Sequence, residues 1–477
     1  DPSLTFSWNV PGNNTLAIRI QVAKAHDNGT ADWSSPVLDQ NLTGTPNSFS
    51  YTVPPSSGYS KYFARVKVEG PSGWDDWGDA SDGISVAGII SGKVKETDGD
   101  DVVGADVVLY LMSDTGRTNP LYTVQTDSSG IFTFSNVPIS MDDDQYRIVV
   151  TASGDRNAAK NNIYVGLGEV TNVGVIYIIP GSGTNPGGIQ GTIVDANTGG
   201  LVGGAIISVR DWEGNEVNST ESSMSDGTFS TASVPAGTYT LVVTKTGFFE
   251  LVVDNVAVTS NPKQMGRVAL CGVLTEPQIR VTLQWGATPT LLDLHVVGPT
   301  LNADTGDASW DGDPTNRFHV FWWSINQGFP WFDPKDRRSY NEATGLYGIS
   351  DPAGALSTTS LVIDYQSGYG PDTINLFRYG GASYAMGVYT FTVHDFSSGG
   401  EWNDYPVTLR IYDSLGLWRE IAVPVNAPAL SAWKAFKINI QGFTRSQRTI
   451  IVNSQDLFED IPCSEDGSTC TKESFDW

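Results

Sequence analysis

The sequence predicts an all-β chain of four tandem β-sandwich domains, and three observations support that fold class. Apolar and polar residues alternate with period two over many short stretches, which is typical of strands buried on one face. The breaks between these stretches contain Gly, Asp, Asn or Pro, and the 51 glycines and 25 prolines fit tight turns. No convincing run of helical periodicity appears. The 477 residues also exceed one β domain, since about 100 to 200 residues per domain is usual.

The first segment, residues 1–86, contains six stretches that can form strands. They are LTFSWNV, LAIRIQVAK, PVLDQNL, SFSYTVP, YFARVKVEG and ISV. The order of Trp8, Tyr62 and the segment SGWDDWGDAS resembles fibronectin type III domains, which are sandwiches with an aromatic core and a tyrosine at one corner. The resemblance covers the whole segment and implies adhesion or spacing rather than catalysis.

The next two segments, residues 87–180 and 188–272, repeat one pattern. The first copy reads IISGKVKETDGDDVVGADVVLYL, TDSSGIFTFSNVP and YRIVVTASG, and the second reads GIQGTIVDANTGGLVGGAIISVR, MSDGTFSTASVP and YTLVVTKTGF. Equivalent positions carry Gly92 and Gly191, Gly104 and Gly204, Gly130 and Gly227, Phe132 and Phe229, and a Val-Pro pair. These motifs resemble the carboxypeptidase-regulatory-like domain, a transthyretin-like sandwich. We expect several of the glycines to occupy turns at positive φ.

The resemblance concerns fold, and no peptidase chemistry accompanies it. None of the four histidines has a Glu at the spacing of a metalloprotease helix, and the chain contains no Gly-x-Ser-x-Gly elbow and no Walker loop. We therefore predict that the protein is not an enzyme.

Residues 273–453 differ in composition, with three of the four histidines and eight of the 14 tryptophans. The segment contains QIRVTLQWGATPTLLDLHVVGP, RFHVFWW, LVIDYQSGYGPDTINL, GVYTFTVHDFSSGG, VTLRIYDSLGLWREIAVPV and WKAFKINI. These blocks, in this order, resemble the YfaP-type domain of uncharacterised bacterial secreted proteins, a family without an established activity. We predict a larger β-sandwich here.

Histidines and carboxylates of this domain form a candidate Zn²⁺ or Ca²⁺ site. Asp293 and His295 alternate on one predicted strand, so both side chains point to the same face, and Asp364 and His394 lie on other strands that could converge there. The family pattern has more carboxylates at these positions, which weakens calcium binding. The alternatives are half-buried structural histidines, which we favour, and a catalytic role.

A second candidate is the loop ADTGDASWDGDPTN, whose Asp304, Asp307, Asp311 and Asp313 offer oxygen ligands for calcium at short spacing. The loop lacks the terminal Glu of an EF-hand, and a solvated loop is the favoured alternative. Calcium is therefore a possible cofactor, and no cofactor is certain.

The tryptophans divide by their surroundings. Trp285, Trp323 and Trp433 lie on predicted strands and are expected in the core. Trp310, Trp331 and Trp402 lie in loops rich in Gly, Asp or Pro and are candidates for contact with a sugar or another protein.

Three cysteines leave one unpaired. Cys463 and Cys470 bracket SEDGST and could form a hairpin disulfide in an oxidising compartment. Cys271 lies in the apolar run RVALCGVL, where a buried inert thiol is favoured over a bond to a neighbouring chain.

The C-terminal tail, residues 454–477, ends with Phe475 and Trp477. We hypothesise that it adds a strand to an exposed sheet edge of the next subunit, a head-to-tail contact that builds a filament. A tail folded back on its own domain is the equal alternative.

The net charge of −25, from 28 basic and 53 acidic residues, argues against nucleic-acid binding. No segment has 18 consecutive apolar residues, so no membrane span is predicted. The chain starts at Asp1, as removal of a signal peptide would leave it, although a truncated chain would look the same. We predict a secreted, extracellular or cell-surface protein.

Taken together, the patterns favour a structural subunit of an extracellular filament or surface matrix, whose main partner is a copy of itself. The alternative is a monomeric adhesin or carbohydrate-binding protein that binds surface glycans or other surface proteins through aromatic loops of the C-terminal domain.

Overall fold

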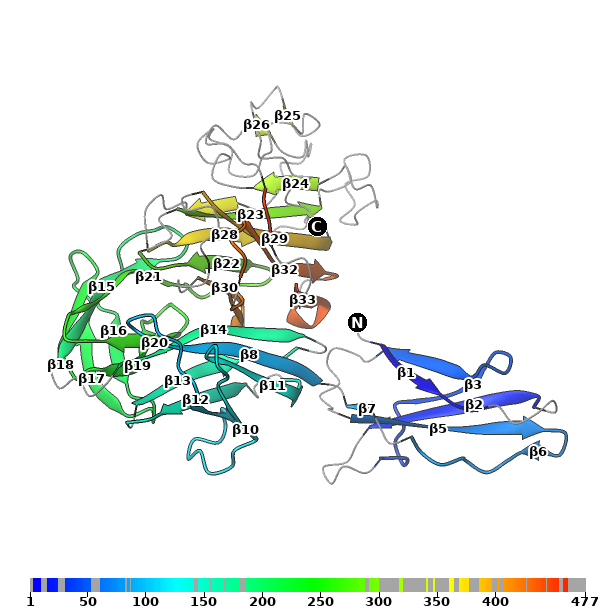
Figure 1. Ribbon diagram of the computed structural model, residues 1–477. Coiled ribbons are helices and arrows are strands. Elements are labelled where there is room, and N and C mark those ends of the chain that lie inside the picture. The colour runs from blue at the N-terminus through cyan, green and yellow to red at the C-terminus, as the bar shows by residue number, and fades with distance from the viewer. Residues whose placement is uncertain are drawn as a thin grey trace. The chain divides into compact units, whose positions relative to one another are not determined.

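The computed structural model confirms the all-β fold class (Figure 1). It describes residues 3–9, 15–24, 31–52, 61–81, 84–85, 87–140, 145–154, 156–166, 169–180, 186–287, 291–299, 317–320, 340–341, 346–347, 360–363, 369–376, 386–396, 402, 407–425, 427–442, 444–453 and 458–461. Within these ranges the helical content is one 3-10 turn at Arg445–Gln447, and no helix is long and apolar enough to cross a membrane.

The chain divides into two compact units. Unit 1 comprises Asp1–Ile90, Phe134–Gln145 and Tyr164–Thr171. Unit 2 comprises Ser91–Thr133, Tyr146–Ile163 and Asn172–Trp477, so it holds most of the first repeat, the second repeat and the C-terminal domain.

In the described residues up to Ser85, the N-terminal part of unit 1 forms two sheets from seven strands. One sheet has the order β1-β4, and the other has the order β3-β2-β5-β6 with β7 also paired to β5. The strands are β1 (Ser3–Ser7), β2 (Ala17–Lys24), β3 (Leu38–Leu42), β4 (Ser48–Thr52), β5 (Lys61–Gly70), β6 (Gly73–Trp74) and β7 (Ile84–Ser85). Six of them match the stretches expected from period-two alternation. Tyr62 is fully buried and packs with Phe6, Ile20 and Val22, as the aromatic-core pattern predicts.

The two repeats have the same sheet topology. In the first repeat, the sheets have the orders β11-β8-β14 and β10-β9-β12-β13, and in the second β18-β15-β21 and β17-β16-β19-β20. The first set is β8 (Ala87–Glu96), β9 (Asp106–Leu111), β10 (Tyr122–Gln125), β11 (Ile131–Pro138), β12 (Tyr146–Ala152), β13 (Arg156–Ile163) and β14 (Val170–Ile178). The second set is β15 (Gly187–Asp195), β16 (Ile206–Arg210), β17 (Glu216–Glu221), β18 (Thr228–Val234), β19 (Gly237–Thr244), β20 (Leu251–Val258) and β21 (Lys263–Leu270). The internal repeat read from the sequence is therefore a repeat of structure.

The shared glycines have a structural reason in both copies. Gly130 and Gly227 have φ values of 71° and 65°, a region that disfavours any side chain. Gly191 leaves room for the ring of Phe229, because a Cβ at Gly191 would lie 2.9 Å from that ring. These positions fix the turns and the close approach of strands that make the sandwich.

The C-terminal domain is a sandwich of two larger sheets. One has the order β27-β28-β22-β30-β31, and the other β24-β23-β29-β32-β33 with β34 paired to β32. The strands are β22 (Ile279–Gln284), β23 (Leu292–Pro299), β24 (Arg317–Val320), β27 (Ser360–Ile363), β28 (Asp372–Leu376), β29 (Gly387–Asp395), β30 (Thr408–Asp413), β31 (Gly416–Ala422), β32 (Ala432–Ile440), β33 (Arg448–Val452) and β34 (Phe458–Glu459). A separate pair joins β25 (Tyr340–Asn341) to β26 (Leu346–Tyr347).

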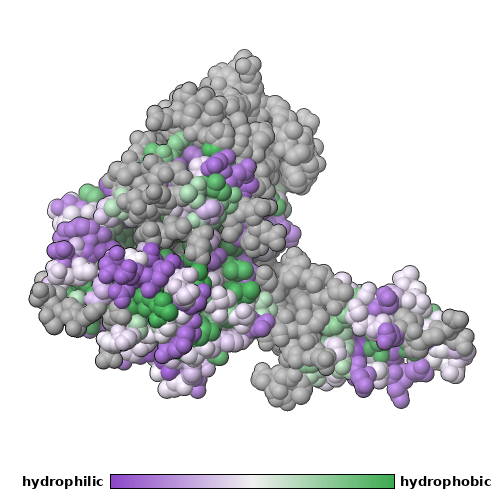
Figure 2. Space-filling model, viewed as in Figure 1, coloured by the Kyte–Doolittle hydropathy of each residue, from purple (hydrophilic) through white to green (hydrophobic). Residues whose placement is uncertain are grey.

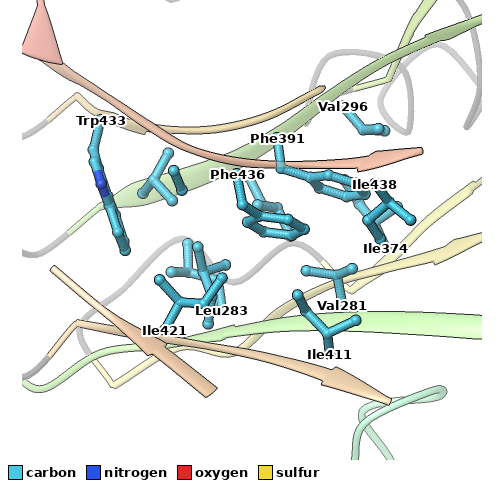
Figure 3. Packing of buried hydrophobic residues seen from close by; sticks show 14 of the residues in the cluster. Val281, Leu283, Val296, Ile374, Phe391, Ile411, Ile421, Trp433, Phe436 and Ile438 are labelled. Carbon is cyan, nitrogen blue, oxygen red and sulfur yellow. The ribbon is translucent and has the colours of Figure 1, made fainter. Parts of the chain in front are cut away.

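The core of this domain lies between the two sheets. Figure 3 shows Phe391 and Phe436 facing Val281 and Ile411 across it, and the two phenyl rings stack with centroids 4.6 Å apart. Trp285 and Trp433 are 2% and 1% exposed and belong to the same cluster, as their strand positions predict. Trp323 lies outside the described residues.

Cys271 has the buried environment favoured from its apolar neighbours. The residue is 1% exposed and packs with Leu274 and Tyr412. Burial raises the pKa of its thiol to about 12, so the thiol stays protonated and unreactive in the folded protein. Cys463 and Cys470 lie outside the described residues.

Candidate functional site

Matching bulges in the two repeats bring their polar residues together. In β13, Asn161 and Asn162 oppose a single residue of β12, and in β20, Asp254 and Asn255 oppose a single residue of β19. Each pair ends in an Asn at positive φ, 55° at Asn162 and 64° at Asn255. A two-against-one bulge redirects side chains out of the regular alternation. The sequences KNNI (160–163) and VDNV (253–256) thus form the same local structure.

The two bulges contact each other directly. The Asp254 carboxylate accepts hydrogen bonds from the Asn161 backbone N–H at 2.9 Å, the Asn161 amide at 2.6 Å and the Thr240 hydroxyl at 2.8 Å. Asn255 accepts a bond from the Tyr177 N–H and donates one to the Val175 carbonyl, both at 2.7 Å. The second repeat is thereby bonded to the backbone of the first.

A buried group of four charged side chains extends this contact to the C-terminal domain. We call Lys160, Asp254, Arg410 and Glu420 the junction cluster. Glu420 accepts a hydrogen bond from Arg410 at 2.8 Å and contacts the Lys160 ammonium, which lies 3.9 Å from Asp254. The four side chains are only 16%, 3%, 9% and 13% exposed. The cluster joins β13, β20, β30 and β31, and its formal charges cancel.

The charges of the junction cluster depend on one another. Burial alone would raise the pKa of Glu420, but the Lys160 ammonium and the Arg410 guanidinium beside it outweigh burial and hold that pKa at about 2. Burial would lower the pKa of Lys160, and the Glu420 and Asp254 carboxylates raise it instead. Both groups therefore stay charged at neutral pH, and either one would be costly to leave alone.

The second repeat meets the C-terminal domain at another polar contact. Asn375 donates to the Asn197 side-chain oxygen at 2.7 Å and accepts a bond from Arg280 at 2.8 Å. The rings of Phe249 and Tyr412 stack with their centroids 6.2 Å apart. Polar contacts thus join each pair of modules in unit 2, and an aromatic contact adds to the boundary between the second repeat and the C-terminal domain.

A cavity of about 350 Å³ adjoins the junction cluster. All four cluster residues line it, together with Val and Ala side chains of β14, β20 and β31 and the rings of Trp285, Tyr369 and Trp402. The charged cluster therefore forms part of the wall of this cavity. Sequence reasoning missed both features, because the residues come from three separate modules.

The structure brings together the predicted histidine site. Asp293 lies opposite His394 in the β23–β29 register, and the rings of His295 and His394 are 6.0 Å apart. The three residues are 2%, 0% and 3% exposed. No group of three or more His, Cys, Asp or Glu that could hold a metal exists among the described residues. Asp364 and the calcium-loop residues Asp304, Asp307, Asp311 and Asp313 lie outside them.

One ring nitrogen of His394 has an identified partner. Its Nε2 lies 3.1 Å from the Ile461 carbonyl oxygen, which belongs to the segment of the tail that pairs with β32. Burial is the main cause that lowers the pKa of His394 to about 4. His295 and His394 are fully buried rather than half-buried as expected. The contact of His394 with a backbone carbonyl supports a structural role for that residue.

The low pKa of His394 predicts that the folded protein loses stability in acid. An unfolded histidine titrates near pH 6.5, so between about pH 6.5 and pH 4 the unfolded chain binds a proton that the folded chain does not. The folded state should lose about 3 kcal/mol over that interval from this residue alone. We expect His394→Gln to show a correspondingly smaller loss, measured by urea unfolding at pH 7 and pH 4. Parallel stability curves for the two proteins would contradict this.

Two expectations need correction. Trp402 is 0% exposed, and its indole donates to the Leu430 carbonyl at 2.7 Å, so it is not a surface contact residue. The Gly- and Asp-rich flanks suggested an exposed loop, but the ring inserts into the core. In the tail, Phe458–Glu459 pairs with β32 of its own domain and Ile461 is buried, so this part folds back rather than docking on a neighbour. Trp310, Trp331, Phe475 and Trp477 lie outside the described residues.

Comparison with known proteins identifies two domains. Residues 89–176 and 188–270 match the carboxypeptidase regulatory-like domain family, in agreement with the two repeats. No curated protein sequence matches the chain.

Several solved structures are similar to the chain at low scores. The Bacillus anthracis TIE protein has a TM-score of 0.18 and 12% identity, with 80% of this chain and 63% of that chain covered. The streptococcal ancillary pilin has a TM-score of 0.17 and 14% identity, covering 57% and 98%. The minor pilin of Streptococcus agalactiae has a TM-score of 0.16 and 16% identity, covering 40% and 98%. The chain thus spans less than two thirds of the first of these, and at such scores none carries a conclusion about it.

Proposed function

We propose that this chain, which contains two carboxypeptidase regulatory-like domains, is a structural protein of a cell surface or extracellular matrix. Its task is to hold surfaces or partners at a fixed geometry. We further propose that residues 1–86 form a fibronectin type III-like domain and residues 273–453 a YfaP-type domain, on the motifs that each segment carries.

The junction cluster is the observation that supports this function. Domains within one chain usually move relative to one another unless their interface is extensive. Here charged side chains from three modules are buried together, and removing one of them takes away a partner of another buried charge. Such an arrangement suppresses rotation between modules, which a spacer or a filament subunit needs and which a flexible tether does not.

Assembly into filaments is the finer part of the proposal. A head-to-tail contact repeated without closure builds a polymer, and the partner is then a second copy of the chain. The tail beyond Ile461 and unpaired sheet edges such as β17 are the candidate contact elements.

Negative-stain electron microscopy and sedimentation velocity of the purified chain test assembly. We expect concentration-dependent elongated particles that shorten when residues 462–477 are deleted, since the described tail contact with β32 is then retained. A single 51.3 kDa species at every concentration would exclude the polymer. It would leave a monomeric structural protein or an adhesin.

One observation favours the adhesin alternative. On the N-terminal domain, Arg65 lies between the rings of Trp33 and Trp77, at 4.3 and 4.8 Å, and Lys67 lies between Trp77 and Trp74, at 4.9 and 5.3 Å. The three indoles are partly exposed, and Arg65 and Lys67 both lie on β5. Aromatic rings of this kind bind sugars or protein partners. Binding of the monomer to immobilised glycans, lost in Trp77→Ala, would support this alternative.

A further inference from the structure

We propose that the cavity beside the junction cluster binds a small amphipathic anion, with its apolar body inside the cavity and its anionic head group at Lys263 on the rim. The site goes beyond the structural function and exists whether or not the chain polymerises. Its volume of about 350 Å³ is within the range of pockets that hold small ligands.

Four edge strands contribute to the wall of the cavity. β20 and β21 end the two sheets of the second repeat, β14 ends a sheet of the first repeat, and β31 ends a sheet of the C-terminal domain. Residues of all four strands line the cavity. The cavity therefore lies where three modules meet, and a ligand held there would stabilise their docked arrangement.

Most of the lining is apolar. Valines of β14 and β20 line the cavity, together with Met265, Ala422 and the ring of Trp402. Apolar surface of this kind gains free energy when a hydrocarbon group displaces water from it. The lining therefore favours a ligand with a hydrocarbon or aromatic body.

Cations outnumber carboxylates on the remaining wall. The lining includes Lys263 and Arg267 in addition to the junction cluster, whose own formal charges cancel. On a chain with a net charge of −25, this surplus of positive charge is a local exception. It favours an anionic ligand over a cationic one, because opposite charges attract more strongly at a site with little water.

Lys263 is the cation placed to bind the head group. It is the first residue of β21, and it both lines the cavity and is exposed, which places it at the rim. Burial lowers the pKa of its ammonium, and no carboxylate among the described residues offsets this, whereas Glu420 and Asp254 raise the pKa of Lys160. An anionic head group beside Lys263 would supply that counter-charge.

The cavity is open to solvent. Gln264 and Ala287, like Lys263, line it and are exposed. In Figure 2, apolar residues lie at the surface of the protein next to strongly polar ones, the combination that an amphipathic ligand requires. A head group at the rim keeps part of its hydration while the apolar body is buried, which avoids the large free-energy cost of burying a charge.

Isothermal titration calorimetry of the full chain with octanoate and octanol tests the site. The two probes have hydrocarbon chains of similar length, and only octanoate is charged. We expect octanoate to bind at one saturable site and octanol to bind about tenfold more weakly. Lys263→Gln should lower octanoate affinity about tenfold and leave octanol affinity unchanged, and its exposed position lets the variant fold.

Two further variants locate the bound probe. Lys245→Gln removes the same charge from the second repeat outside the cavity lining, so octanoate affinity should not change. Ala422→Leu fills part of the cavity and should weaken the binding of both probes. The proposal is overturned if octanoate gives no saturable heat below the concentration at which it forms micelles, or if both probes bind equally well. It is also overturned if Lys263→Gln and Lys245→Gln have the same effect, or if Ala422→Leu leaves binding unchanged.

Discussion

Glu420→Ala is expected to lower the free energy of unfolding of the chain by about 3–5 kcal/mol, because it leaves two buried cations without their shared anion. Glu420 bonds to Arg410 at 2.8 Å and contacts Lys160, and both cations are at most 16% exposed. Urea unfolding followed by tryptophan fluorescence measures the difference.

A matched control variant shows how much of the expected loss of stability is due to burial of the ion pair. Glu459 also pairs with a lysine, at 2.5 Å from Lys434, but its side chain is 54% exposed. Glu459→Ala should cost no more than about 1 kcal/mol. Similar costs for the two variants would show that the junction cluster behaves as an ordinary surface pair.

The pH dependence of unfolding gives a second test with the same variant. The pKa of Glu420 is about 2 in the folded protein and about 4.5 when unperturbed, so its stabilisation is complete above pH 4.5 and is lost as the pH falls toward 2. The stability difference between the unchanged protein and Glu420→Ala should shrink over that interval. A constant difference would contradict the assignment of a low pKa to Glu420.

Asp254→Ala is expected to have an effect of similar size, about 3–5 kcal/mol. The carboxylate is 3% exposed and is the acceptor for Asn161 of the first repeat and Thr240 of its own repeat. The variant leaves those donors without their acceptor and removes one of the two carboxylates beside the Lys160 ammonium. Asp106→Ala is the control, because Asp106 accepts one bond from Gln125 at the surface.

Combining the two substitutions tests whether the four charges act as one group. Glu420 and Asp254 both contact Lys160. Each single change already removes part of the electrostatic stabilisation of that ammonium. The free energy of unfolding of the double variant should therefore fall by roughly 1 kcal/mol less than the sum of the two single losses, or by a still smaller amount. Strict additivity would mean that the two carboxylates act independently and that no shared cluster exists.

The fold could be read from the sequence wherever local rules decide it. Period-two alternation and turn residues located most strands of the N-terminal segment and both repeats, and the matched glycines lie at turns and close approaches. The same alternation placed Asp293 and His295 on one face, and the β23–β29 register brought His394 to them.

Features that depend on partner strands could not be read in this way. The bulge at Asp254 and Asn255 is defined by the single residue opposite it on β19, so the dipeptide alone does not predict it. The repeated pattern of KNNI and VDNV was the available signal. The junction cluster required contacts across 260 positions of the chain, between Lys160 and Glu420. Trp402 was misplaced because loop composition predicts exposure and cannot foresee that one side chain inserts into the core.

We propose that the second repeat, the C-terminal domain and the part of the first repeat that belongs to unit 2 are held as one rigid body. Spin labels at Thr123→Cys in the first repeat and Leu415→Cys in the C-terminal domain test it most directly, since both positions are exposed. Cys463 and Cys470 are replaced by Ser, and the buried Cys271 does not react. Pulsed electron–electron double resonance should give one narrow distribution of the distance between the two spin labels, and this distribution should broaden in Glu420→Ala. A broad distribution in the unchanged protein would contradict the claim.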